Sequence, residues 1–144
     1  MGKDNNMIDI LITESKAGDL HNIEVSSAHI YTHLMKFISI RPISTSWIGT
    51  IKNQNKELIK IKNTSYWREV ANDPVRLEKI KRKAISDFEN DGNKNGEILF
   101  NIVHNDLYDI TKFKDINILK NYMISRLDPI EDQDMINYVN HQLK

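Results

Sequence analysis

Residues 26–42 decide the fold, and their sequence is SSAHIYTHLMKFISIRP. Ser26 or Ser27 can cap the start of a helix in this stretch. Pro42 must end that helix, because proline lacks the N–H that a helix interior needs. Between these limits, apolar side chains recur every three or four residues, at Ala28, Tyr31, Leu34, Met35 and Ile38. This spacing places them on one face and predicts an amphipathic α-helix that packs into a core.

The same helical spacing continues on both sides of this stretch. Towards the N-terminus, Met7–Ala17 is expected to form a helix that Gly18 closes, although Met7–Ile12 alone also fits a strand. Towards the C-terminus, Ser44-Thr45-Ser46 is expected to start a helix, and the short segment Ser65–Asn72 follows it. The helix between them carries its apolar residues at Trp47, Ile48, Ile51, Leu58 and Ile61.

Aspartates mark the expected starts of three later helices. Asp73 precedes Pro74, and Asp115 precedes another apolar-periodic segment, so each is expected to cap a helix. The stretch Asp128-Pro129-Ile130-Glu131 resembles a capping box at the start of the last helix. The polar run 90–96 contains two glycines and is expected to be a loop.

Composition agrees with one helical domain. The chain has 144 residues, of which 40% are hydrophobic and 28% charged, and its mean hydropathy is −0.51. Five glycines and three prolines are few for an all-β domain with many turns. We therefore predict an all-α fold, a single compact domain of six to eight helices over residues 1–144, with residues 1–6 disordered. Its buried core is expected to include Leu34, Trp47, Ile51, Leu77, Ile102 and Leu119.

Several catalytic classes lack support in this sequence. The chain has no cysteine, which excludes a disulfide framework, a thiolate nucleophile and a zinc site with sulfur ligands. It contains no Gly-x-Ser-x-Gly elbow, Walker loop or dinucleotide fingerprint. We therefore expect a protein that is not an enzyme and that has no cofactor. An uncharacterised enzyme or a metal protein is a further alternative.

Two histidines are the weak candidates for a metal site. His29 and His33 lie four residues apart on the predicted helix, which lets two imidazoles share one metal ion. No third ligand stands at a diagnostic spacing, so no metal is expected. The alternative is that His33 packs beside Trp47 while His29 faces solvent.

The N-terminal residues and the amino-acid composition indicate the location and the source of the protein. The N-terminal residues lack the uninterrupted apolar stretch of a signal peptide, and the composition argues against a membrane span. A cytoplasmic location is therefore expected. Isoleucine, asparagine and lysine are abundant and have AT-rich codons, which indicates a low-GC bacterium or one of its phages.

Two short motifs within residues 14–91 point to a family. His33-Leu34-Met35-Lys36 lies on the predicted helix, and Ser44-Thr45-Ser46-Trp47 follows the proline-bearing connection. In these motifs the chain resembles a bacterial family catalogued only as domain of unknown function twenty-nine. Members usually carry an acid-rich helix before the histidine, whereas Ile23 to Ala28 contain only Glu24. The resemblance implies an all-α fold and transfers no catalytic residue.

Charge is segregated along a chain whose formal net charge is zero. Residues 41–85 hold eleven basic and four acidic side chains, whereas residues 86–144 hold six basic and eleven acidic ones. The acidic residues could meet a basic protein, and the basic ones could meet phosphates; the alternative for both is a solvated helix face. The acidic candidates are Asp128, Glu131, Asp132 and Asp134, and the basic candidates are Lys52, Lys56, Lys60, Arg76, Lys79, Arg82 and Lys83.

The leading expectation is a small protein-binding protein, most plausibly a toxin-neutralising immunity protein or antitoxin with a basic toxin as partner. Such inhibitors often present an acidic patch, because complementary fields speed association. Trp67 is a further candidate contact, because a partly exposed tryptophan is typical of interfaces, and a core position is its alternative. The runner-up function is a nucleic-acid-binding helical module that uses the basic 41–85 segment.

Overall fold

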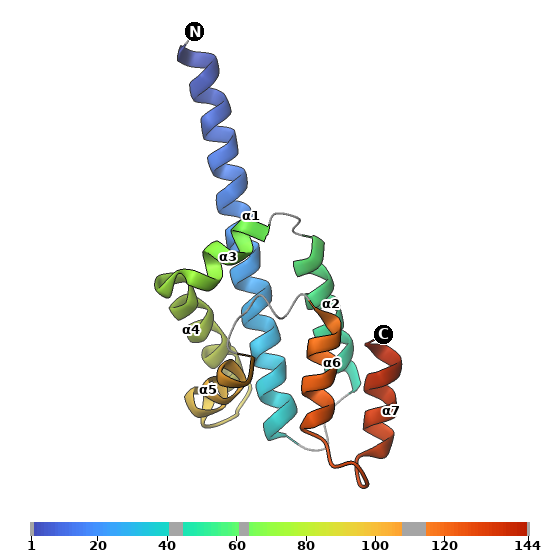
Figure 1. Ribbon diagram of the computed structural model, residues 1–144. Helices are drawn as coiled ribbons and strands as arrows, with labels where there is room; N and C mark the ends of the chain where they lie inside the picture. The colour runs from blue at the N-terminus through green and yellow to red at the C-terminus, as the bar shows by residue number, and fades with distance from the viewer. Residues whose placement is uncertain (1, 41–44, 61–63, 108–114, 144) are drawn as a thin grey trace.

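The computed structural model describes residues 2–40, 45–60, 64–107 and 115–143, and it describes their side chains from residue 16 onward except at 64, 65 and 107. These residues form seven α-helices and contain no strand, which confirms the predicted all-α class (Figure 1). The helices are α1 (Gly2–Ser39), α2 (Thr45–Lys60), α3 (Thr64–Asn72), α4 (Pro74–Asn90), α5 (Gly96–Leu107), α6 (Ile116–Ser125) and α7 (Gln133–Gln142).

Helix α1 is the centre of the fold. Helices α2, α3, α4 and α5 all pack against it. Helices α6 and α7 contact each other, and α7 also contacts α2, so this pair lies on the α2 side of α1 (Figure 1). A helix with neighbours on several sides must be apolar on several sides. The fully buried side chains of α1 satisfy this condition and include Ile23, Ala28, Ile30, Tyr31, Leu34, Met35 and Phe37.

Helix α1 is longer than the sequence predicts. It is continuous from Gly2 to Ser39, so the prediction that Gly18 closes a helix is wrong. A glycine inside a helix costs only about 1 kcal/mol relative to alanine. Leu20 and Ile23 are buried just after Gly18, and each buried aliphatic side chain stabilises the fold by about 1.5–3 kcal/mol. Burial of these two side chains therefore outweighs the local preference of the glycine.

The continuity of α1 corrects a further expectation. Ser26 and Ser27 lie inside the helix rather than at its start, and Ser27 is fully buried. Gly2–Asn6 belong to the helix, and the predicted disorder of residues 1–6 stays a prediction. In Figure 1 the N-terminal part of α1 extends beyond the other helices.

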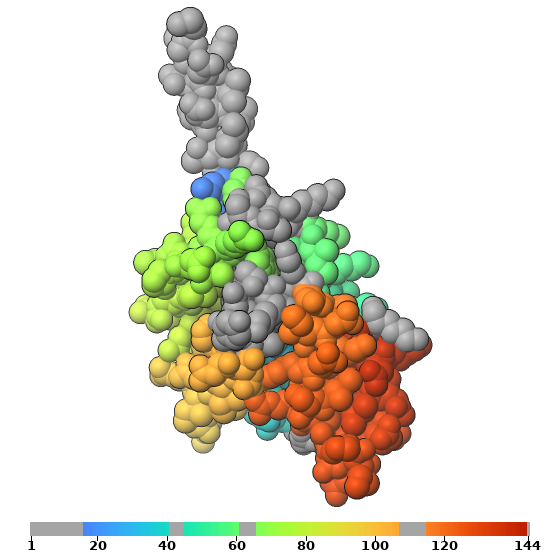
Figure 2. Space-filling model, in the orientation of Figure 1, coloured from blue at the N-terminus to red at the C-terminus, as the bar shows by residue number. Residues whose placement is uncertain are grey.

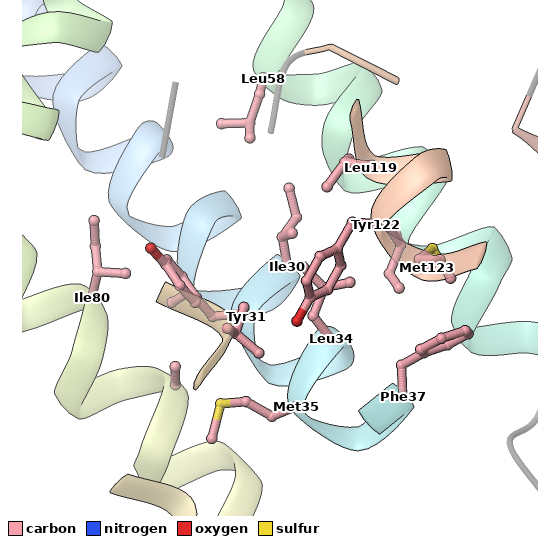
Figure 3. Close-up of a cluster of buried hydrophobic side chains, with 14 of the residues drawn as sticks. Ile30, Tyr31, Leu34, Met35, Phe37, Leu58, Ile80, Leu119, Tyr122 and Met123 are labelled. Carbon is pink, nitrogen blue, oxygen red and sulfur yellow. The ribbon is translucent and has the colours of Figure 1, made fainter. Parts of the chain in front are cut away.

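The buried core matches most of the predicted one (Figure 3). Leu34, Ile51 and Leu119 are fully buried, and Trp47 and Leu77 pack partly buried against them. Ile102 contradicts the prediction, because 37% of it is exposed. Helix α5 instead directs Phe100 and Val103 into the core, one helical turn apart, and this register turns Ile102 towards the surface.

Two predicted helix starts are confirmed. Asp73 accepts a hydrogen bond from the backbone N–H of Val75 through Oδ1 at 2.9 Å, and Pro74 takes the first helical position of α4. Asp115 accepts the N–H of Asn117 in the same way at 2.9 Å at the start of α6. Each bond joins residues two apart in the chain, which is why local sequence suffices to predict it.

The connection between α4 and α5 brings these helices together. The predicted loop is confirmed over 91–95, where Gly92 (φ 88°) and Asn95 (φ 64°) adopt left-handed backbone conformations and reverse the chain. Gly96 then starts α5 in a buried position, where a Cβ would lie 3.0 Å from Cγ2 of Ile85. The absence of a side chain at Gly96 therefore lets α4 and α5 approach closely.

Candidate functional site

The turn between α6 and α7 holds the acidic candidates. Asp128 Oδ1 accepts the backbone N–H groups of Ile130 at 2.8 Å and Glu131 at 2.9 Å. In return, Asp132 Oδ2 accepts the backbone N–H of Asp128 at 2.8 Å. The two carboxylates thus satisfy three backbone donors, and the turn is held by its own side chains.

This geometry corrects the predicted capping box. Helix α7 begins at Gln133 rather than directly after Asp128, and Asp132 rather than Glu131 closes the reciprocal pair. The backbone N–H of Asp132 donates to the carbonyl oxygen of Asp128 at 3.1 Å, so one helical turn separates the two residues. At that spacing the short side chain of Asp132 faces Asp128. Asp128 and Asp132 therefore have structural roles.

Solvent-exposed side chains lie in this turn, at Ile130 and Glu131, and in the first turn of α7, at Asp134. Ile130 is 86% exposed, more than the other large exposed hydrophobic residues of the described chain. Glu131 and Asp134 are exposed, and neither forms an ion pair with a described residue. The turn protrudes at one end of the molecule (Figures 1 and 2). We call Ile130, Glu131 and Asp134 the acidic tip: one apolar side chain with two carboxylates near it in the chain.

Trp67, the aromatic candidate, does not reach this surface. It lies on α3 and is only 3% exposed, which agrees with the core alternative. Its indole Nε1 is buried and has no hydrogen-bond partner among the described residues. Trp67 therefore contributes to packing and offers nothing to a partner in this conformation.

The basic candidates lie on two separate helices, α2 and α4, on different sides of α1 (Figure 1). On α4, Arg76 pairs with Glu24 at 2.5 Å, Arg82 with Glu78 at 3.1 Å and Lys83 with Asp87 at 3.4 Å. Lys79 is exposed and forms no ion pair with a described residue. Phosphate binding requires cations that can replace counterions, and three of the four on α4 already face carboxylates.

Helix α2 carries the other three basic candidates. Lys52, Lys56 and Lys60 are spaced four residues apart, and Lys60 pairs with Glu57 at 3.0 Å. Lys52 and Lys56 form no ion pair with a described residue. The structure thus does not join the seven basic residues into one surface, which weakens the geometric case for a nucleic-acid interface.

The two candidate metal ligands of α1, His29 and His33, are both partly buried, so His29 is not fully turned to solvent. Burial, and to a smaller extent the nearby Lys36 ammonium, lowers the pKa of His33 to about 4. His33 Nδ1 is buried and has no hydrogen-bond partner among the described residues. Within that part of the chain, no three histidine, aspartate or glutamate side chains are placed to hold a metal ion. His33 is therefore a neutral imidazole packed at the edge of the core.

A buried lysine near His33 was missed from the sequence. Lys36 is only 8% exposed, and it forms an ion pair with Asp91, which follows α4. Its Nζ also lies 5.3 Å from the centre of the Trp47 ring on α2. The hydrogen bond that Lys36 Nζ donates to Asp91 Oδ2, together with the positive charge of Lys36, holds the pKa of the Asp91 carboxyl below its usual value. Lys36 and Trp47 belong to the two quoted motifs, whereas Asp91 lies 55 residues from Lys36 and no spacing connects them.

A second unexpected pair joins α1 to α5. The hydroxyl group of Tyr31 and Nδ1 of His104 are hydrogen-bonded at 2.8 Å, across 73 residues of sequence. The Phe100 ring lies 4.5 Å from the Tyr31 ring, centre to centre, and is nearly parallel to the His104 ring at 11°. Tyr31 was predicted only as a core residue, and nothing in the sequence pairs it with His104.

Comparison of the chain with protein-family models, curated proteins and solved structures finds no match. None of the described helices combines the length and apolar character that crossing a membrane requires.

Proposed function

We propose that this chain is a non-catalytic protein-binding protein that binds a basic partner through the acidic tip, as a toxin-neutralising immunity protein or antitoxin would. The observation that supports the proposal is Ile130, whose side chain is 86% exposed on a turn held by two carboxylates. An apolar side chain this exposed contributes little to packing within the described part of the chain. Burying it in a partner would contribute about 1.5–3 kcal/mol to binding.

The construction of the turn suits recognition. Asp128 and Asp132 fix the backbone, so little conformational entropy is lost when a partner binds. Glu131 and Asp134 supply negative charge beside the apolar contact, and charge of this kind steers a basic partner into encounter. A partner of complementary chemistry has an apolar socket bordered by lysine or arginine side chains.

The first experiment compares what three forms of the chain retain from the native host. The forms are the wild type, Ile130→Asp and the matched control Ile98→Asp, which alters an exposed isoleucine on α5. We expect a basic protein to be retained by the wild type and by Ile98→Asp, and to be lost from Ile130→Asp. Retention by Ile130→Asp at the wild-type level would show that the acidic tip is not the contact.

The same preparation also tests the nucleic-acid alternative. Phosphate contacts make affinity fall steeply as salt rises. Retained nucleic acid that dissociates between low and moderate salt, together with the absence of any retained protein, would contradict the proposal and favour the basic residues of α2.

A further inference from the structure

A pocket of about 310 Å³ opens between α4 and α5, and its lining includes Tyr31 of α1. Its apolar part is formed by Pro74 and Leu77 of α4 and by Phe100 of α5. The volume lies in the range of natural small-molecule sites, which are mostly apolar and have a few placed polar groups. The pocket is separate from the acidic tip and shares no residue with it.

The inner wall of this pocket is aromatic and fixed in place. Tyr31 is fully buried, and its hydrogen bond to His104 Nδ1 at 2.8 Å ties α1 to α5. Phe100 contacts both rings, 4.5 Å from the centre of Tyr31 and 5.8 Å from that of His104. In Figure 3, Tyr31 extends from α1 towards Ile80 on α4, which also lines the pocket. Such a wall suits a flat aromatic ring, since offset or tilted rings attract at these separations.

Hydrogen-bond donors complete the lining. Lys81 lies seven residues after Pro74, about 10 Å further along α4, and Asn101 follows Phe100 on α5. Lys81 pairs with Glu97 at 3.2 Å, but Glu97 is 70% exposed, so water competes for this contact and its net strength is small. The one acidic residue of the lining, Glu78, faces Arg82 at 3.1 Å, which offsets its charge.

We propose that this pocket binds a small aromatic carboxylate. The aromatic ring packs against Leu77 and Phe100, and the carboxylate accepts hydrogen bonds from the Lys81 ammonium and the Asn101 amide. This inference does not depend on the function proposed for the acidic tip.

The test measures binding of three probes to the full chain by calorimetry. The probes share a naphthalene ring and differ in charge: 2-naphthoate, neutral 2-naphthylmethanol and cationic 2-naphthylmethylammonium. For a ligand of this size we expect 2-naphthoate to bind with a Kd of about 0.1–1 mM. The neutral probe should bind about tenfold more weakly, because it lacks the charge-assisted hydrogen bonds. This comparison needs only the wild-type chain.

Two variants and one control locate the binding. Lys81→Met keeps the aliphatic stem and should weaken 2-naphthoate binding about tenfold while leaving 2-naphthylmethanol unchanged. Leu77→Trp fills the apolar part and should abolish binding of both. Lys79→Met removes an exposed lysine that does not line the pocket and should change nothing.

Four results would overturn the proposal. The first is that 2-naphthoate does not bind at about 5 mM, which is about five times the weakest expected Kd. The second is equal affinity of the chain for 2-naphthoate and for the neutral probe. The third is that Lys81→Met and Lys79→Met change 2-naphthoate binding equally. Binding that survives Leu77→Trp would also overturn it, since the ligand would then lie elsewhere.

Discussion

His33 has a proton equilibrium that depends on folding. Its pKa is about 4 in the folded chain and about 6.5 when the side chain is exposed, because burial and Lys36 disfavour the imidazolium. Above pH 6.5 the imidazole is neutral in both states and the fold has its full stability. As pH falls from 6.5 towards 4, the unfolded chain binds a proton that the folded chain does not, so stability is lost over that window.

A glutamine at this position should remove that dependence. Between pH 7 and 4.5, we expect the free energy of unfolding to fall by about 1–2 kcal/mol less for His33→Gln than for the wild type. This energy takes into account that the His33 ring is only partly buried. Urea denaturation at several pH values measures this difference. The control is His141→Gln at an exposed position, which should follow the wild type. Parallel curves for His33→Gln and the wild type would show that His33 titrates alike in both states.

At the scale of single elements, sequence predicted those features whose causes are local. Asp73 and Asp115 cap α4 and α6 through bonds to residues two apart in the chain. Gly18 fails as a helix end because side chains buried against later helices outweigh its local preference. The sequence predicts the position of the acidic turn between α6 and α7. It does not predict the exposure of Ile130, because exposure depends on how α6 and α7 pack. Contacts such as Lys36–Asp91 and Tyr31–His104 are set by the fold and have no spacing to reveal them.

The α6–α7 turn has a testable internal support. Asp128→Ala removes the acceptor of two backbone N–H groups and should cost about 1 kcal/mol. For a chain of this length, that cost should lower the Tm by about 2–4 °C. Glu131→Ala is the matched control one helical turn away, and its exposed side chain should leave the Tm nearly unchanged. Equal Tm values for the two variants in a thermal scan would show that the carboxylate of Asp128 does not hold the turn.

At the scale of the whole molecule, the acidic tip should act as a source of long-range attraction. The double variant Glu131→Lys/Asp134→Lys should slow association with the basic partner about tenfold or more at low salt, because charge complementarity acts mainly on encounter. Raising the salt concentration should bring the two rates together, since the Debye length shortens to about 8 Å at physiological ionic strength.

Stopped-flow mixing at several salt concentrations measures this effect. Asp128 and Asp132 are left intact because they hold the turn. Lysine at position 134 also removes a favourable charge from the first turn of α7, at a cost of about 0.3–1 kcal/mol, so the fold should persist. The control Glu57→Lys/Glu69→Lys reverses the same number of charges on α2 and α3. Equal slowing by both double variants would assign the effect to net charge.

The central place of α1 also bears on how the chain folds during its synthesis. This helix leaves the ribosome before every helix that covers it, and α5, which supplies His104 to Tyr31, begins only at residue 96 of 144. Helices α2 and α3 emerge before α4, but until α4 and α5 follow, the side of α1 that α4 and α5 cover stays exposed, and exposed apolar surface of this kind invites aggregation. A nascent chain stalled before α4 would therefore expose the apolar side of α1 that α4 and α5 cover in the finished core, and it would depend on chaperones for solubility.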